Sequence, residues 1–195
     1  MRVIKGRDMK KTIIAAIFTL LASATTAQAM DVEPYVGVGV GGYLLKDTTA
    51  GTKIAYGGYG QLGADIGDYL GAELRFGASG KATRTTPVLG GVDVDINTNI
   101  DYIFSFLGKL QMPVSEKVQF YGLLGATRAK VVDNMKKPGF VFISTGTTSR
   151  FTRTTSFSFG GGLDFKVQDK LVIGAEYMHY YKNISGFSAN IKYSF

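Results

Sequence analysis

His179 is the only histidine in this chain, so acid–base catalysis by an imidazole would depend on it. A serine nucleophile needs such a base within hydrogen-bond reach, and the base needs an acid that orients it. The residue two positions after His179 is Tyr181, Ser185 is predicted to lie in a loop, and Glu176 has the opposite alternation parity. The spacing therefore predicts no catalytic residue and no enzyme, and His179 is interpreted as one of the aromatic residues at a strand end.

An acidic segment that begins at Asp93 and reads Asp-Val-Asp-Ile-Asn-Thr-Asn is a second candidate site. It resembles the opening of a calcium loop, which requires glycine at its sixth position and a bidentate glutamate at its twelfth. Thr98 and Phe104 stand at those positions, so we predict no metal site and no cofactor, with a weak divalent-ion contact as the alternative. The chain has no cysteine, which excludes disulfide and thiolate chemistry.

The elements that would position these residues are strands, because alternation with period two recurs along the chain. Three connections are tight turns, and most of the others are longer, which is the asymmetry of membrane β-barrels. The eight predicted strands are 33–45, 54–67, 69–80, 95–112, 117–131, 152–167, 170–182 and 186–195, and the longer loops include 81–94 and 132–151. The even strand count places both chain termini on the side of the tight turns.

Residues 1–29 have the three parts of a secretory signal peptide, namely a basic start, an apolar stretch too short to span a bilayer, and an A-x-A site that ends at Ala29. The initiator is either Met1 or Met9. Cleavage leaves 30–195 as one β-barrel domain whose net charge is (22 − 5) − (15 − 1) = +3. Because most of the basic balance belongs to the targeting segment, the charge gives no indication of nucleic-acid binding.

Alternation leaves two barrels open. A soluble barrel turns its apolar face inward, whereas a membrane barrel turns it toward lipid. The apolar faces carry no charge across their middle, as in the series that includes Leu74 and Phe76 and the series that includes Phe104 and Phe106. The strands also reach the roughly 9–11 residues that a tilted strand needs to cross a bilayer. Both features favour the membrane barrel.

If the apolar face points to lipid, the charged residues of opposite parity point into the lumen. Five acids and five bases are predicted there: Asp65, Glu73, Asp101, Asp164 and Glu176 with Arg75, Lys109, Arg128, Lys166 and Lys192. An eight-stranded barrel is just wide enough for side chains to fill it, and unpaired charges in that space are costly. We therefore predict a network of ion pairs that plugs the lumen, with a gated channel as the alternative.

The last strand, 187–195, alternates apolar and polar residues and ends in Phe195. It resembles the closing strand of bacterial outer-membrane β-barrels, in which the terminal aromatic residues are read by the barrel-assembly machinery. The resemblance implies that Tyr193 and Phe195 are the assembly signal. Asn190 stands where the family often has glycine, which is a minor departure.

The whole mature chain is similar to the small outer-membrane β-barrel family, which includes OmpA-barrel-like, OmpX-like and opacity-type surface proteins. The segments that carry the resemblance are 71–77, 159–165, 174–177 and 191–195. It implies an all-β fold, an eight-stranded antiparallel transmembrane β-barrel preceded by a cleavable signal peptide. It also implies a monomer in the cell outer membrane with both termini periplasmic and no nucleic-acid partner.

The resemblance implies outer-membrane lipid and lipopolysaccharide as partners. Five cations lie in and beside the third long loop, opposite one acid, Asp133, for a local charge of 5 − 1 = +4: Lys130, Lys136, Lys137, Arg150 and Arg153. These cations are a predicted contact for lipopolysaccharide phosphates, with an ordinary solvated loop as the alternative.

The function expected from the sequence is non-enzymatic, in envelope integrity or in surface interaction through the loops. One alternative is a narrow passive pore. The other is a lipid A-modifying enzyme, but the lipid A deacylase family has a serine two residues after its histidine, where this chain has Tyr181.

Overall fold

The computed structural model describes residues 31–47, 51–88, 92–136 and 147–195, and next to the gaps it describes the backbone alone for some residues. The predicted signal peptide, 1–29, lies outside this part of the chain. The regular elements within it are all β-strands. No helix in these ranges is long and apolar enough to cross a membrane.

The strands form where residues alternate between two kinds of environment. In the segment around Phe76, Glu73 and Arg75 are each 2% exposed, whereas Phe76 itself is 62% exposed. The bounds are β1 Val32–Asp47, β2 Gly51–Ile66, β3 Leu70–Ser79, β4 Ala82–Val88, β5 Val92–Pro113, β6 Val118–Lys136, β7 Thr147–Gln168, β8 Leu171–Tyr181 and β9 Ile184–Ser194. Charged side chains inside and aromatic side chains outside are the reverse of a water-soluble barrel, so the choice between the two barrels is settled.

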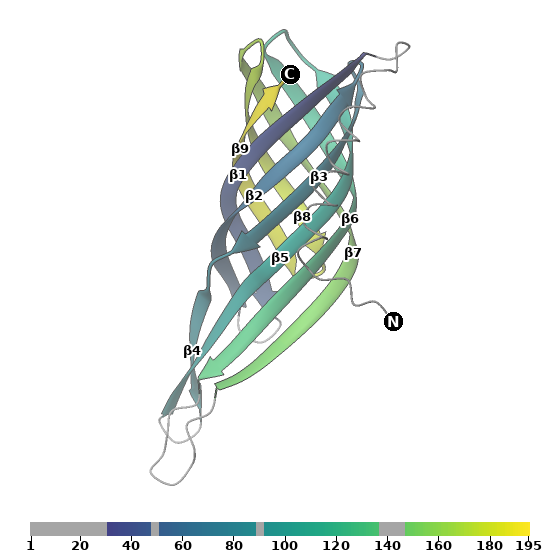
Figure 1. Ribbon diagram of the computed structural model, residues 1–195. Coiled ribbons are helices and arrows are strands. Elements are labelled where there is room, and N and C mark those ends of the chain that lie inside the picture. Colours follow the sequence, from purple (N-terminus) through teal and green to yellow (C-terminus); the bar gives the residue numbers. More distant parts are fainter. Residues whose placement is uncertain (1–30, 48–50, 89–91, 137–146) are drawn as a thin grey trace, which may run out of the picture.

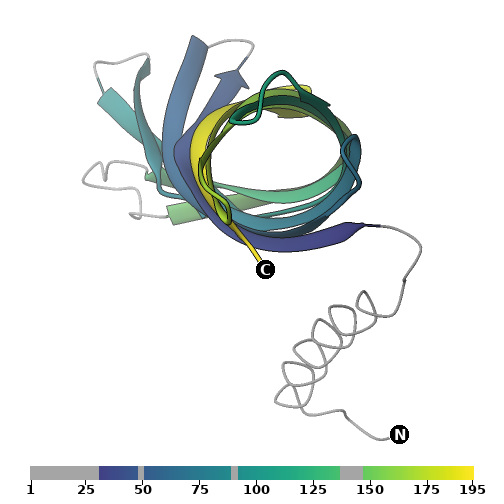
Figure 2. The same cartoon turned by 90° about the horizontal axis from the view of Figure 1, so that it is seen from above.

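The sheet is antiparallel and closes on itself. β1 pairs with both β2 and β9, and β5 pairs with β6 on one side and with β3 and then β4 on the other. β3 and β4 therefore count together as one of eight strands around the ring that Figure 2 shows from above. The predicted fold, an eight-stranded antiparallel barrel, is confirmed.

The ladder is staggered, which tilts the strands in Figure 1. Starting at Leu44 of β1, successive partners around the ring are Ser185, His179, Phe159, Leu124, Gly108, Ala72 and Ala64. Ala64 then pairs with Pro34, so the circuit returns to β1 at 44 − 34 = 10 residues from its start. Stagger, tilt and width are linked in a closed barrel, and at eight strands the side chains just fill the interior.

The two ends of the barrel differ. At the short-turn end lie Asp31, Phe195 and three tight turns, one of which bends at Gly67 with a φ of 60°. At the opposite, extended end, parts of β4, β5, β6 and β7 project beyond the other strands (Figure 1). The loops predicted at 81–94 and 132–151 are therefore wrong in large part, because most of these residues continue the antiparallel ladder.

A closed barrel leaves no strand of the ring to detach first, so its hydrogen bonds break together. We predict that the refolded protein migrates differently on SDS gels before and after boiling, because detergent alone does not open a closed ladder. The control is the same protein denatured in urea and never refolded, which should run at one position in both lanes. Identical mobility of the boiled and unboiled refolded samples would contradict closure.

Candidate functional site: the lumen and the outward rim

The centre of the lumen holds a buried ion triad. Arg75 on β3 donates through Nε to Glu73 and through both terminal nitrogens to Glu176 on β8, with 2.6 Å between Nη2 and Oε2. Two tyrosines donate further hydrogen bonds to these carboxylates. Tyr35 Oη donates to Glu73 Oε2 at 2.6 Å, and Tyr121 Oη donates to Glu176 Oε2 at 2.9 Å. Each carboxylate is therefore held by the guanidinium and by one hydroxyl.

A second ion cluster lies nearer the short-turn end. Lys192 Nζ donates to Asp164 Oδ2 at 2.6 Å, and Lys109 Nζ lies 3.1 Å from Asp65 Oδ1 and 3.8 Å from the same Asp164 oxygen. Gln111 also donates to Asp65. Two ammonium groups are thus buried side by side, and the carboxylates between them offset their repulsion.

Tyr35 and Tyr121 join the two clusters. Lys192 Nζ lies 4.5 Å from the centre of the Tyr121 ring, and Lys109 Nζ lies 5.2 Å from the centre of the Tyr35 ring. Each tyrosine therefore uses its hydroxyl on the triad and its ring face on an ammonium group. Room for the Tyr121 ring comes from Gly162, where a Cβ atom would collide with it. Neither tyrosine was predicted to be part of the lumen network, although the alternation parity of both places them inside.

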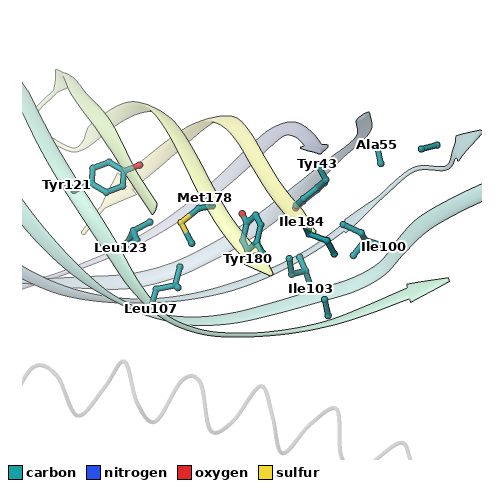
Figure 3. Packing of buried hydrophobic residues seen from close by; sticks show 12 residues of the cluster. Tyr43, Ala55, Ile100, Ile103, Leu107, Tyr121, Leu123, Met178, Tyr180 and Ile184 are labelled. Carbon is teal, nitrogen blue, oxygen red and sulfur yellow. The ribbon is translucent and has the colours of Figure 1, made fainter. Parts of the chain in front are cut away.

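The lumen becomes mainly apolar toward the extended end. On β5, the inward-facing residues on that side of Lys109 are Leu107, Ser105, Ile103 and Ile100, and all four are buried; the only polar one, Ser105, shares a hydrogen bond with Thr127. The other strands contribute Tyr43, Leu123, Met178, Tyr180 and Ile184 to the same cluster, whose side chains gather between the strands in Figure 3. We call this cluster the apolar plug. The prediction of an interior filled with ion pairs is therefore incomplete, because the ion pairs occupy only the part of the lumen nearer the short turns.

A polar cup opens at the short-turn end, next to the second ion cluster. Its volume is about 120 Å³, and Lys109, Asp164 and Lys192 are among its lining residues. Lys166 also lines the cup and is exposed at its mouth. The inward position predicted for Lys166 is thus observed, but no ion pair joins it to another described residue.

Arg128 was predicted to face the lumen, and this prediction is wrong. Its neighbours on β6, Thr127 and Ala129, are buried and face inward, whereas Arg128 is exposed and pairs across the ladder with Phe104, which lies on the outer surface. Residues directly opposite on an antiparallel ladder share a face, so Arg128 points outward. The inner and outer positions of β6 are similarly apolar, for instance Leu123 and Leu124, and the alternation there gave no clear assignment.

Asp101 was also predicted to lie inside and also lies outside. The register of β5 against β6 shifts between Ile100 and Tyr102. The bulge turns Ile100 into the lumen and Asp101 outward, where its Oδ2 accepts a hydrogen bond from Lys130 Nζ at 2.6 Å. The lumen network of the structure therefore consists of seven of the ten predicted residues: Asp65, Glu73, Arg75, Lys109, Asp164, Glu176 and Lys192.

A band of exposed apolar side chains surrounds the barrel, and we call it the apolar belt. The outer surface carries three cations where this belt ends. Arg128 and Lys130 follow one another on the outward side of β6, and Arg153 of β7 pairs with Lys130 across the ladder. We call these three residues the outward rim. Of the predicted lipopolysaccharide contacts, Lys130 and Arg153 belong to this rim. The side chains of Lys136 and Arg150, and the whole of Lys137, lie outside the described residues.

His179 and Ser185 lie closer together than the sequence indicated. Ser185 belongs to β9 and is not in a loop, and its Oγ is 3.0 Å from His179 Nδ1. The His179 ring also packs on Phe159, with 5.1 Å between ring centres. Ser185 is only 1% exposed, so its hydroxyl is not accessible to an external substrate.

The acidic segment at Asp93 does not assemble a visible metal site. Asn97 Oδ1 accepts a hydrogen bond from Thr83 Oγ1 at 2.7 Å, and the side chains of Asp93 and Asp95 lie outside the described residues. Among the side chains that the structure does describe, no group of three or more histidine, cysteine, aspartate or glutamate residues could hold a metal ion.

The predicted assembly signal lies at the closing seam. Phe195 N donates to Pro34 O at 3.0 Å, and the Tyr193 and Phe195 rings meet edge to face on the outer surface, with 5.7 Å between their centres. Their role in assembly stays a prediction.

Comparison with solved structures gives the same fold. The chain is similar to Ail, the attachment invasion locus protein of Yersinia pestis, solved in complex with the heparin analogue sucrose octasulfate, at 21% identity over 85% of this chain and 100% of that chain, with a TM-score of 0.54. It is similar to Neisserial surface protein A at 14% identity over 85% and 99%, with a TM-score of 0.57. A major outer membrane protein of Thermus thermophilus matches at 11% identity over 84% and 99%, with a TM-score of 0.64.

No curated protein sequence matches the chain. The family model of the outer membrane protein β-barrel domain matches residues 13–195. That match covers almost the whole chain, and it agrees with the closed barrel, the charged interior and the apolar outer belt. The chain therefore belongs to the outer membrane protein β-barrel domain family and is an integral protein of the outer membrane.

Proposed function

We propose that this protein is a non-enzymatic, non-conducting component of the outer membrane that binds lipopolysaccharide phosphates through its outward rim. The observation that carries the proposal is the outward position of Arg128 beside Lys130 and Arg153. All three cations lie where the apolar belt ends at the extended end of the barrel. Since the chain termini and short turns lie at the other end, the rim is at the height of the outer-leaflet phosphates.

The local geometry suits a lipid phosphate. The ladder partners of Arg128 and Lys130 on β5 are Phe104 and Tyr102, so each cation has an aromatic neighbour on the outer face. Aromatic rings at this level occupy the membrane interface, and long cationic side chains extend along the barrel wall toward the headgroups. Asp101 binds Lys130 and lowers the charge of the group, which leaves a net charge of 3 − 1 = +2 for these four side chains.

The apolar plug supports a non-conducting barrel. An ion that enters from the polar cup meets the two ion clusters and then a region lined by Ile103, Met178 and Tyr180, which offers it no charged partner. Moving an unpaired ion into such surroundings is strongly unfavourable. Rearranging the salt bridges would leave this barrier in place, which disfavours the gated channel.

The buried position of Ser185 supports the absence of catalysis. A nucleophile must reach its substrate and needs a base that is held in place. The Ser185–His179 hydrogen bond satisfies the first geometric condition for a nucleophile and base, but the serine hydroxyl is enclosed. The pair is better explained as a structural link between β8 and β9.

Removing two rim cations should weaken lipopolysaccharide binding. We expect the double variant Arg128→Gln, Arg153→Gln to lose about 2 kcal/mol, or roughly 30-fold in affinity, because each cation near an anionic surface contributes about 1 kcal/mol. Binding of fluorescent lipopolysaccharide to protein in phosphatidylcholine nanodiscs measures the change. The matched control is Lys117→Gln, Lys170→Gln, which removes two cations at the short-turn end. Equal losses in the two double variants would contradict a specific rim.

Planar-bilayer recordings should show no steady conductance for the parent protein. The variant Glu176→Gln, which weakens the triad but leaves the apolar plug intact, should also stay closed. Gel mobility before and after boiling checks that each sample is folded. Steady channels in the parent would contradict the non-conducting barrel, and channels in Glu176→Gln alone would show that the triad is a gate.

The buried triad should contribute far more to stability than the rim. We expect Arg75→Ala to lower the free energy of unfolding by about 3–5 kcal/mol, because Glu73 and Glu176 would remain buried without their cation. Lys130→Ala removes a partly exposed ion pair and should cost about 0–1 kcal/mol. Urea unfolding of both variants in the same detergent gives the comparison. If Arg75→Ala lowers the free energy of unfolding no more than Lys130→Ala does, the stabilising role of the triad is contradicted.

A further inference from the structure

The polar cup at the short-turn end carries more negative than positive charge. Five of its lining residues are carboxylates and four are lysines, for a net charge of 4 − 5 = −1. The triad deeper in the lumen does not offset this surplus, because Arg75 there faces both Glu73 and Glu176. A surplus of negative charge inside a narrow lumen attracts a cation.

Two of the cup carboxylates lie directly opposite each other. Glu33 of β1 pairs with Asp65 of β2 across the ladder, and both line the cup. Residues at such positions have Cβ atoms about 5 Å apart, and like charges there destabilise the pairing. Lys109 and Gln111 bind Asp65, whereas Glu33 forms no ion pair with another described residue. The mouth of the cup therefore has a place for one more cation between two carboxylates.

A third carboxylate of the cup has an unused acceptor. Asp164 is only 5% exposed, and Lys192 and Lys109 both pair with its Oδ2. Its Oδ1 has no hydrogen-bond partner among the described residues. Gly174, its ladder partner on β8, has no side chain beside this oxygen, since a Cβ there would lie 2.5 Å from it. A buried acceptor without a donor is costly, so Asp164 favours a ligand that carries hydrogen-bond donors.

The chemistry of the cup suits an ammonium group better than a metal ion. Among the described side chains, no group of three or more histidine, cysteine, aspartate or glutamate residues could hold a metal. An ammonium group instead donates three hydrogen bonds and needs no complete shell of ligands. Lys109 shows that such a group fits here, since its Nζ lies 3.1 Å from Asp65 Oδ1 and 3.8 Å from Asp164 Oδ2.

The size of the cup limits the ligand. Its volume is about 120 Å³. A cavity of about 150 Å³ accepts benzene, so the cup has room for an amine of about four or five non-hydrogen atoms.

We propose that the polar cup binds a small primary amine from the periplasmic solution. The ammonium group lies between Glu33 and Asp65, and the rest of the molecule extends into the cup toward Asp164. The short turns of outer-membrane barrels face the periplasm, so a dissolved amine reaches the cup without passing the apolar plug. This site lies at the other end of the barrel from the outward rim and needs no lipopolysaccharide.

The test uses the full mature chain refolded in a non-ionic detergent, without lipopolysaccharide, and ethanolamine is the probe. Backbone amide NMR shifts follow the titration at pH 7, with sodium chloride added to keep the ionic strength constant. We expect a Kd of about 1 mM or lower, with shifts at Glu33, Asp65 and Asp164 and none at 128–130 of the rim. Tetramethylammonium has the same charge but no N–H donor, so it should bind about tenfold more weakly or worse.

The variant Glu33→Gln should bind ethanolamine about tenfold more weakly, because one of the two carboxylates around the ammonium group loses its charge. Glu33 is exposed, so the change leaves the packed interior intact, and gel mobility before and after boiling checks the fold. The matched control is Asp68→Asn, which removes a carboxylate in a short turn that does not line the cup. This control should bind ethanolamine as the parent does.

Each other outcome overturns the proposal. An absence of shifts at millimolar ethanolamine would mean that the cup is not an amine site, and equal binding of tetramethylammonium would mean that charge alone attracts the probe. Equal losses in Glu33→Gln and Asp68→Asn would mean that only the net charge of this end matters. No loss in Glu33→Gln would place the amine elsewhere. If that variant does not fold, the comparison with tetramethylammonium in the parent still decides.

Discussion

The pairing of β1 with β9 is the interaction on which the rest of the structure depends. Lipid offers no hydrogen-bond partners, so each N–H and C=O group of a spanning strand must bind a neighbouring strand. The circuit from Leu44 back to Pro34 satisfies this requirement with a stagger of ten residues. Closure also decides which side chains meet inside. Arg75 of β3 and Glu176 of β8 lie 101 positions apart in the chain, and only the closed ring brings them together.

The sequence predicted the architecture well because the two faces of a membrane strand differ in polarity at every second residue. In β3, Arg75 and Phe76 differ so strongly that their faces follow from the residues alone. In β6, both faces are apolar or small, so a single charge, Arg128, was assigned to the wrong face. In β5, the bulge at Ile100 reverses the parity of Asp101, and no residue type indicates that bulge. Contacts that depend on register, such as the Ser185–His179 pair, were also beyond the sequence.

The division of the lumen follows from the cost of buried charge. A carboxylate inside a narrow barrel needs several donors, and the two clusters supply them from opposite walls, with Tyr35 and Tyr121 serving both. Nearer the extended end, the inward positions on β5 are Ile100 and Ile103, which need no polar partners. The ion pairs therefore link the strands across the lumen, whereas the apolar plug fills the part nearer the extended end.

The strands are paired on both sides within the membrane, whereas outside the membrane some strand edges are unpaired among the described residues. Within the belt an unpaired edge would leave polar groups in lipid, and the ring closes completely. Beyond the belt water can satisfy those groups, so the sheet of β4 to β7 can end in an edge without that penalty. β4 is short and carries Pro87, which limits further pairing, but Thr147–Phe157 of β7 has no such feature. Water thus permits an unpaired strand edge at this height, which lipid would not.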